Sequence, residues 1–97
     1  MGYVQIIEVK TSNYDQIRKL DEEWQAATVG RRTATRSVVT QDRDQPGTYV
    51  IMVEFPSYEA AQTNNDLPET AHFAAEIGAL SDGMTFRNLD VVDDNVL

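Results

Sequence analysis

The feature that most constrains the fold is the order in which strand-like and helix-like segments follow one another along the 97 residues. Residues 3–9 are rich in β-formers and alternate, with Val4 and Ile6 on one side and Gln5 on the other, which predicts a strand. Ser12 and Asp15 resemble a capping box and predict the start of a helix that ends near Gly30. The apolar stripe of this helix recurs at spacings of three and four residues: Ile17, Leu20, Trp24 and Ala27.

Two further strands and two further helices are expected downstream. Residues 33–41 and 48–55 are rich in β-branched residues and flank the turn signal at 44–47, which predicts an antiparallel hairpin. Ser57 can cap a short helix to about Asn65, and Asp66 followed by Pro68 marks the start of a separate helix to about Leu80. Residues 84–92 alternate and should form the last strand.

The resulting order is β, α, β, β, α in two pieces, β. This order predicts an α+β fold of the ferredoxin-like βαββαβ type, with a four-stranded antiparallel sheet and the helices on one face. Residues 1–92 are expected to form a single domain, because a chain of this length builds one core, and residues 93–97 an acidic tail.

The other face of the predicted sheet combines apolar and charged side chains. We expect these residues to share it: Val4, Ile6, Glu8, Arg36, Val50, Met52, Glu54 and Arg87. A half-apolar face with balancing charges suits burial against a copy of itself, since a two-fold axis brings each patch against its own equivalent. We therefore predict a homodimer in which two sheets pack as an α/β barrel; the alternative is a monomer with a solvated sheet face.

Composition excludes several classes of partner and cofactor. Sixteen acidic against eight basic residues, a formal charge of −8, argue against nucleic acid, whose phosphates are bound mainly by Lys and Arg. No apolar run is long enough to cross a bilayer and no signal peptide is recognisable, so a cytoplasmic protein without a membrane partner is expected. With no cysteine and one histidine, no metal site, haem or flavin is expected.

Several segments together resemble the antibiotic-biosynthesis-monooxygenase type of dimeric α+β barrel, over nearly the whole chain. They are residues 3–8, the helix carrying Trp24, the strand 49–55, the Ser-capped segment 57–61 and residues 67–73. The resemblance implies a ligand pocket between the sheet and the helices of each subunit.

His72 is the candidate catalytic residue, as the one side chain whose unperturbed pKa lies near neutrality. It borders the apolar stripe of its helix, where a pocket-lining group would lie, although Glu69 and Glu76 nearby also fit a solvated, ion-paired surface. The candidate substrate-binding residues are Trp24, Tyr49, Tyr58, Asn64 and Asn65. Each has a structural alternative, as a core anchor, a packing aromatic or a helix-terminating residue.

Three functional classes remain open. The first is a cofactor-independent oxygenase that holds a small, partly apolar ligand and takes a proton from it. The second is a non-enzymatic ligand-binding or stress-associated dimer. The third is a haem-degrading protein, for which His72 matches the ligating histidine, while Gln62 replaces that branch's tryptophan and no matching asparagine lies in the first strand.

Overall fold

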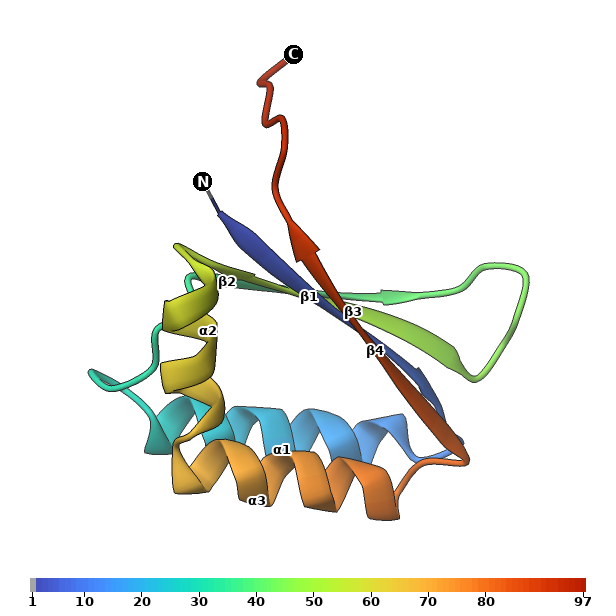
Figure 1. Ribbon diagram of the computed structural model, residues 1–97. Helices are drawn as coiled ribbons and strands as arrows, with labels where there is room; N and C mark the ends of the chain where they lie inside the picture. The colour runs from blue at the N-terminus through green and yellow to red at the C-terminus, as the bar shows by residue number, and fades with distance from the viewer. Residues whose placement is uncertain (1) are drawn as a thin grey trace.

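The computed structural model describes residues 2–97 and confirms the expected order of elements. The strands are β1 (Tyr3–Lys10), β2 (Arg36–Gln41), β3 (Thr48–Phe55) and β4 (Gly83–Asp90). The helices are α1 (Tyr14–Ala27), α2 (Tyr58–Asn65) and α3 (Pro68–Ala79). One antiparallel sheet has the strand order β2-β3-β1-β4, and all three helices lie on one side of it (Figure 1). This is the ferredoxin-like arrangement.

The helix boundaries follow local chemistry, with two corrections to the expected caps. Asn13, rather than Ser12, is the N-cap of α1, and the backbone N–H of Asn13 donates to the Thr11 hydroxyl at 2.9 Å. Leu67, rather than Asp66, precedes α3 and makes no side-chain cap. The residue before a proline is driven to extended backbone, so Pro68 at the first position of α3 separates it from α2.

Two other expected features are present. The Ser57 hydroxyl accepts the amide of Ala60 at 3.1 Å and caps α2 as predicted. Gly47 closes the β2–β3 hairpin with a φ of 87°, a left-handed conformation that favours glycine.

The second strand starts at Arg36 instead of residue 33, because the backbone N–H of Thr33 donates to the Asn64 side chain and not to a neighbouring strand.

The strand register fixes which side chains share a face. On β1, Gln5, Ile7 and Val9 face the helices, and Val4, Ile6 and Glu8 lie on the uncovered side, as expected. The register places the whole predicted mixed face together, since Val4 and Arg36 both pair with Glu54, and Ile6 pairs with Met52 and Arg87.

The buried core is divided into two clusters. Val9, Ile17, Ile51 and Ile77 join the sheet to α1 and α3 at one end, and Tyr3, Phe55 and Ala61 join it to α2 at the other. A hollow remains between these two clusters and forms the site described below. Residues 91–97 contain no helix or strand and extend away from the sheet (Figure 1).

Candidate functional site

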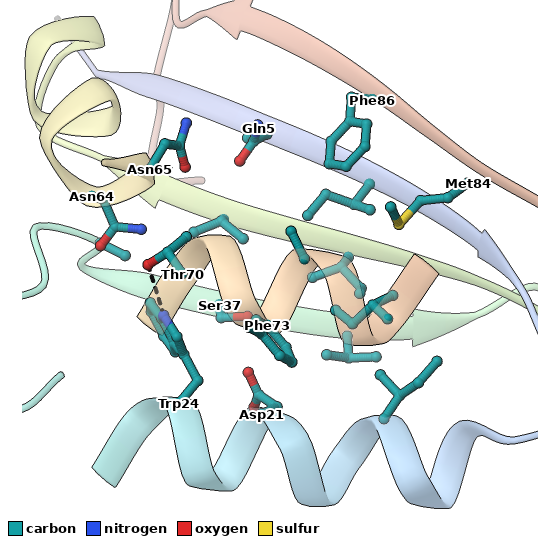
Figure 2. Close-up of a pocket in the computed structure, with 18 of the residues that line it drawn as sticks. Gln5, Asp21, Trp24, Ser37, Asn64, Asn65, Thr70, Phe73, Met84 and Phe86 are labelled. Atoms are coloured by element: carbon teal, nitrogen blue, oxygen red, sulfur yellow. Dashed lines mark hydrogen bonds between the residues drawn. The ribbon is translucent and has the colours of Figure 1, made fainter. Parts of the chain in front are cut away.

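A cavity of about 430 Å³ lies between the inner face of the sheet and helices α1 and α3, with the end of α2 at one side (Figure 2). Its wall is largely apolar and combines aromatic rings with a smaller set of polar groups. The aromatic rings are Tyr14, Trp24, Phe73 and Phe86, beside Phe55 at the α2 end. The polar groups are Gln5, Arg18, Asp21, Ser37, Asn64, Asn65, Thr70 and Asn88. An apolar chamber with few polar groups is the usual form of a small-molecule site.

Trp24 is held in the wall by contacts from both sides. Its indole Nε1 donates to the Thr70 hydroxyl at 2.9 Å, which links α1 to α3 (Figure 2). Its ring stacks against Phe73, with centroids 6.0 Å apart and planes inclined by 22°. The Arg32 guanidinium lies over the indole at 5.8 Å from the ring centroid. These contacts fix the orientation of a flat aromatic surface that faces the cavity.

Asp21 projects from α1 toward the cavity, beside Trp24 and on the side of Phe73 (Figure 2). Its Oδ2 accepts a hydrogen bond from Gln25 Nε2 at 2.6 Å, one helical turn further on. Burial raises the pKa of Asp21 above its ordinary value; Glu22 acts in the same direction, and the hydrogen bond from Gln25 and the charge of Arg32 oppose it. The cavity thus contains a carboxyl group that takes up a proton more readily than an exposed aspartate.

Asn64 is buried and oriented at the α2 end of the cavity. Its Oδ1 accepts the amide of Thr33 at 3.2 Å, so that its side-chain nitrogen lies on the cavity side (Figure 2). Asn65 also lines the cavity from an exposed position. On the sheet, Gln5 and Asn88 are register partners on β1 and β4 and add two further amides. These amides can hydrogen-bond the oxygen atoms of a ligand.

A second, more polar hollow of about 210 Å³ adjoins the first. The two share Asp21, Trp24, Ala34 and Ser37 in their walls. Arg32 and Arg36 contribute only to the smaller hollow, between the second half of α1 and the edge strand β2. Asp21 therefore stands at the junction of an apolar chamber and a polar one.

Three of the six predicted site residues line the cavity: Trp24, Asn64 and Asn65. Tyr49 lies outside it and stacks on Tyr14, with ring centroids 4.3 Å apart. Tyr58 is half exposed and meets the edge of Tyr3.

The position of His72 differs most clearly from the one that the sequence predicts. Its side chain is exposed on α3 and does not belong to the cavity wall. Of its two acidic neighbours, Glu69 pairs with Arg31 at 2.8 Å and so links α3 to the turn after α1. The proposed pocket role of His72 therefore has no support in the geometry, because the helix turns it away from the neighbouring Phe73 wall.

Sequence reasoning missed Asp21, although a signal was present. Asp21 lies four residues after Ile17 and three before Trp24, which puts a carboxylate on the predicted buried stripe of α1. Gln5, beside Ile7 on the inner face of β1, is a similar case. A polar residue on an apolar stripe marks a position where burial alone does not explain the choice.

Within residues 2–97, no group of three or more His, Cys, Asp or Glu side chains is arranged to hold a metal ion. Within the same residues, no helix is both long and apolar enough to span a bilayer.

No protein-family model matches the sequence, and no curated protein sequence matches it. Solved structures, in contrast, match over almost the whole chain. An asparagine-to-alanine variant of SnoaB, described as a cofactor-independent oxygenase from Streptomyces nogalater, superposes with a TM-score of 0.81 at 13% identity, covering 96% of this chain and 95% of that one. The chain shares the fold of this structure.

Two further structures agree with this assignment of the fold. A protein described as an antibiotic biosynthesis monooxygenase has a TM-score of 0.74 at 20% identity, covering 96% of this chain and all of that one. Rv0793 from Mycobacterium tuberculosis has a TM-score of 0.79 at 15% identity, covering 99% of this chain and all of that one. The resemblance noted in the sequence is thus confirmed at the level of the fold.

Proposed function

We propose that the protein binds a small, largely apolar aromatic molecule in the 430 Å³ cavity and oxygenates it without a cofactor. The cavity itself carries the proposal. Its stacked Trp24 and Phe73 on the helices and Phe86 on the sheet offer flat surfaces for fused rings. Its amides and Asp21 supply the few polar contacts that orient such a ligand. SnoaB, which shares the fold, is described as a cofactor-independent oxygenase.

The reaction requires that the ligand supply the electrons. In a polycyclic phenol with a ring methylene, O₂ can convert the CH₂ group to a carbonyl; one oxygen atom enters the product and the other leaves as water. All four electrons that reduce O₂ come from the two C–H bonds of the ligand. The protein would hold the ring system, accept a proton and exclude water from the reacting carbon.

Oxygen uptake with anthrone as the probe tests this proposal, in buffer containing EDTA and no flavin. We expect uptake above the spontaneous rate and a product that has gained one oxygen and lost two hydrogens, with the label from ¹⁸O₂ in the new carbonyl. Ala74→Trp should abolish the enzymatic rate by filling the cavity, whereas Ala75→Trp, at an exposed position outside the wall, should keep it. Equal rates for both variants would contradict a reaction in the cavity.

A non-enzymatic binding role is the second candidate, favoured by the sparse titratable chemistry of the wall. Of the 23 residues that line the cavity, Tyr14, Arg18 and Asp21 are the titratable ones. If anthrone binds to the wild type and not to Ala74→Trp, while oxygen uptake stays at the spontaneous rate, this second role replaces the first.

We also propose that two copies pair through the uncovered sheet face. The solvent-accessible surface of 6566 Å² exceeds the value of about 5,600 Å² expected for a compact monomer of this mass by about 1,000 Å². The uncovered sheet face and the extended segment 91–97 are parts that a compact monomer would not expose (Figure 1). Burial of about 800 Å² on each partner is typical of a stable interface.

The mixed composition of this face fits a contact between copies. Met52 and Leu89 are each 38% exposed on it, and Arg36 Nε lies 3.8 Å from Glu54 Oε2 within it. Light scattering at low micromolar concentration should give twice the chain mass of 10.9 kDa. A mass of one chain at all concentrations would contradict the pairing.

A further inference from the structure

Asp21 is the one aspartate or glutamate in the cavity wall within residues 2–97. It is half-buried on α1, between Ile17 and Trp24 on the stripe that faces the cavity. An apolar residue would pack there without the cost of removing a charge from water. A carboxylate kept at such a position points to a ligand group that it contacts.

We propose that Asp21 recognises a phenolic or enolic hydroxyl of the bound ligand by accepting its hydrogen, and so selects hydroxylated aromatics over plain ones. This inference rests on the proposed aromatic ligand and adds its functional group. Gln25 occupies Oδ2 at 2.6 Å and restrains the carboxylate, and within residues 2–97 no second side-chain or backbone donor bonds to it. Oδ1 is therefore free to accept from the ligand.

The surroundings favour a neutral hydroxyl donor over a cationic group. Arg18 lines the same cavity, and Arg32 lines the adjoining hollow and lowers the pKa of Asp21 by its charge. An ammonium ion at Asp21 would meet the charge of the Arg32 guanidinium, and like charges in a partly desolvated site repel. A hydroxyl carries no charge and keeps the hydrogen bond.

The same contact gives the proton a path. When the hydroxyl transfers its proton, the ligand O–H bond breaks, an O–H bond forms at Oδ1, and the ligand is left as the electron-rich phenolate. Burial raises the pKa of Asp21, which makes the carboxylate a better acceptor. Because Asp21 also borders the polar hollow, the proton can reach solvent without crossing the apolar chamber.

The charged groups that set the pH dependence come from three parts of the chain. Arg18 and Glu22 lie on α1, Arg32 follows it, and Arg36 on β2 faces the smaller hollow. From α3 the cavity receives uncharged side chains, among them Thr70 and Phe73. The arginines stay charged over the accessible range, so the loss of binding at low pH should follow protonation of Asp21, whose pKa lies above its ordinary value.

Binding of β-naphthol and its methyl ether distinguishes recognition of the hydroxyl from binding of the rings. The ether has almost the same shape and no hydrogen to donate. We expect both to bind the wild type, with the naphthol preferred by roughly tenfold, the scale of a hydrogen bond to a charged group. Asp21→Asn should reduce this preference, because a neutral amide oxygen accepts more weakly than a carboxylate, and should leave ether affinity unchanged; Asp21→Glu should keep more of it. Glu23→Gln is the control and should behave as the wild type, since Glu23 is exposed, lies outside the cavity wall and does not shift the pKa of Asp21.

The pH dependence of the two affinities is a second, independent measurement. Naphthol affinity of the wild type should fall as the pH is lowered through the raised pKa of Asp21, and ether affinity should stay level. If the ether fails to bind the wild type, the aromatic site itself is refuted. If the ether binds but the naphthol shows no advantage that depends on Asp21, the site stands and this inference fails. Tighter binding of naphthylmethylammonium than of naphthol would also overturn it, in favour of charge pairing.

Discussion

Replacing Met52 by glutamate tests whether the uncovered sheet face is where two copies meet. Met52 lies in the middle of that face, between its register partners Ile6 on β1 and Val38 on β2, and is 38% exposed in the single chain. Full burial of a methionine is worth about 1.5–3 kcal/mol, so covering the exposed part stabilises the pair by about 0.6–1.1 kcal/mol for each copy. The two-fold axis doubles this to about 1–2 kcal/mol.

The introduced charge weakens the dimer further. A carboxylate removed from water without a partner costs several kcal/mol, and the nearby Arg36 is already paired with Glu54. A total of at least about 4 kcal/mol corresponds to a dimer roughly a thousandfold weaker. Sedimentation velocity across a dilution series measures this directly.

Val29→Glu is the matched control, since Val29 is 70% exposed in the turn after α1, on the helix side of the sheet (Figure 1). It should leave the dimer dissociation constant unchanged. If Met52→Glu dimerises as tightly as the wild type, the sheet face is not the interface and its exposed apolar surface has another origin.

Three smaller changes test the site. Trp24→Phe removes the bond to Thr70, worth about 1 kcal/mol, and should lower Tm by about 4–8 °C in a calorimetric scan, whereas an unchanged Tm would show that this bond contributes nothing. Asp21→Asn should raise Tm at pH 7, because the raised pKa means that the charged form opposes folding, and the gain should shrink as the pH falls toward 3.8; a lower Tm at pH 7 would contradict this. His72→Ala should alter neither Tm nor ligand affinity, since the side chain is exposed and outside the cavity, and a tenfold loss of affinity would disprove that placement.

The fold could be predicted because its signals are local and agree with one another. Alternation in β1, the Ser57 cap and the break at Pro68 each act within a few residues, and together they allow one order of elements. The caps of α1 and α3 each lie one residue beyond the predicted position: Ser12 and Asn13 are both polar candidates before α1, and Pro68 makes Leu67 the residue before α3. The mixed face of the sheet followed from period-two alternation alone.

The site was predicted only in part because it depends on how elements meet. Trp24 could be placed on an inward stripe, but its partner Thr70 lies 46 residues away on another helix. His72 was chosen for its chemistry, and a rotation of about 100° from Phe73 decided that it faces solvent. Asp21 was overlooked because charged residues on helices are usually taken as solvated, although its spacing from Ile17 already placed it inside.

The central claim is that the hollow between sheet and helices is a site for an aromatic ligand, and a crystal structure with the methyl ether of β-naphthol tests it most directly. We predict that the fused rings lie in the 430 Å³ cavity, against the stacked Trp24 and Phe73 on one side and Ile7 of the sheet on the other. Rings found only on the outer face of the sheet, with the cavity closed by its own side chains, would contradict the account.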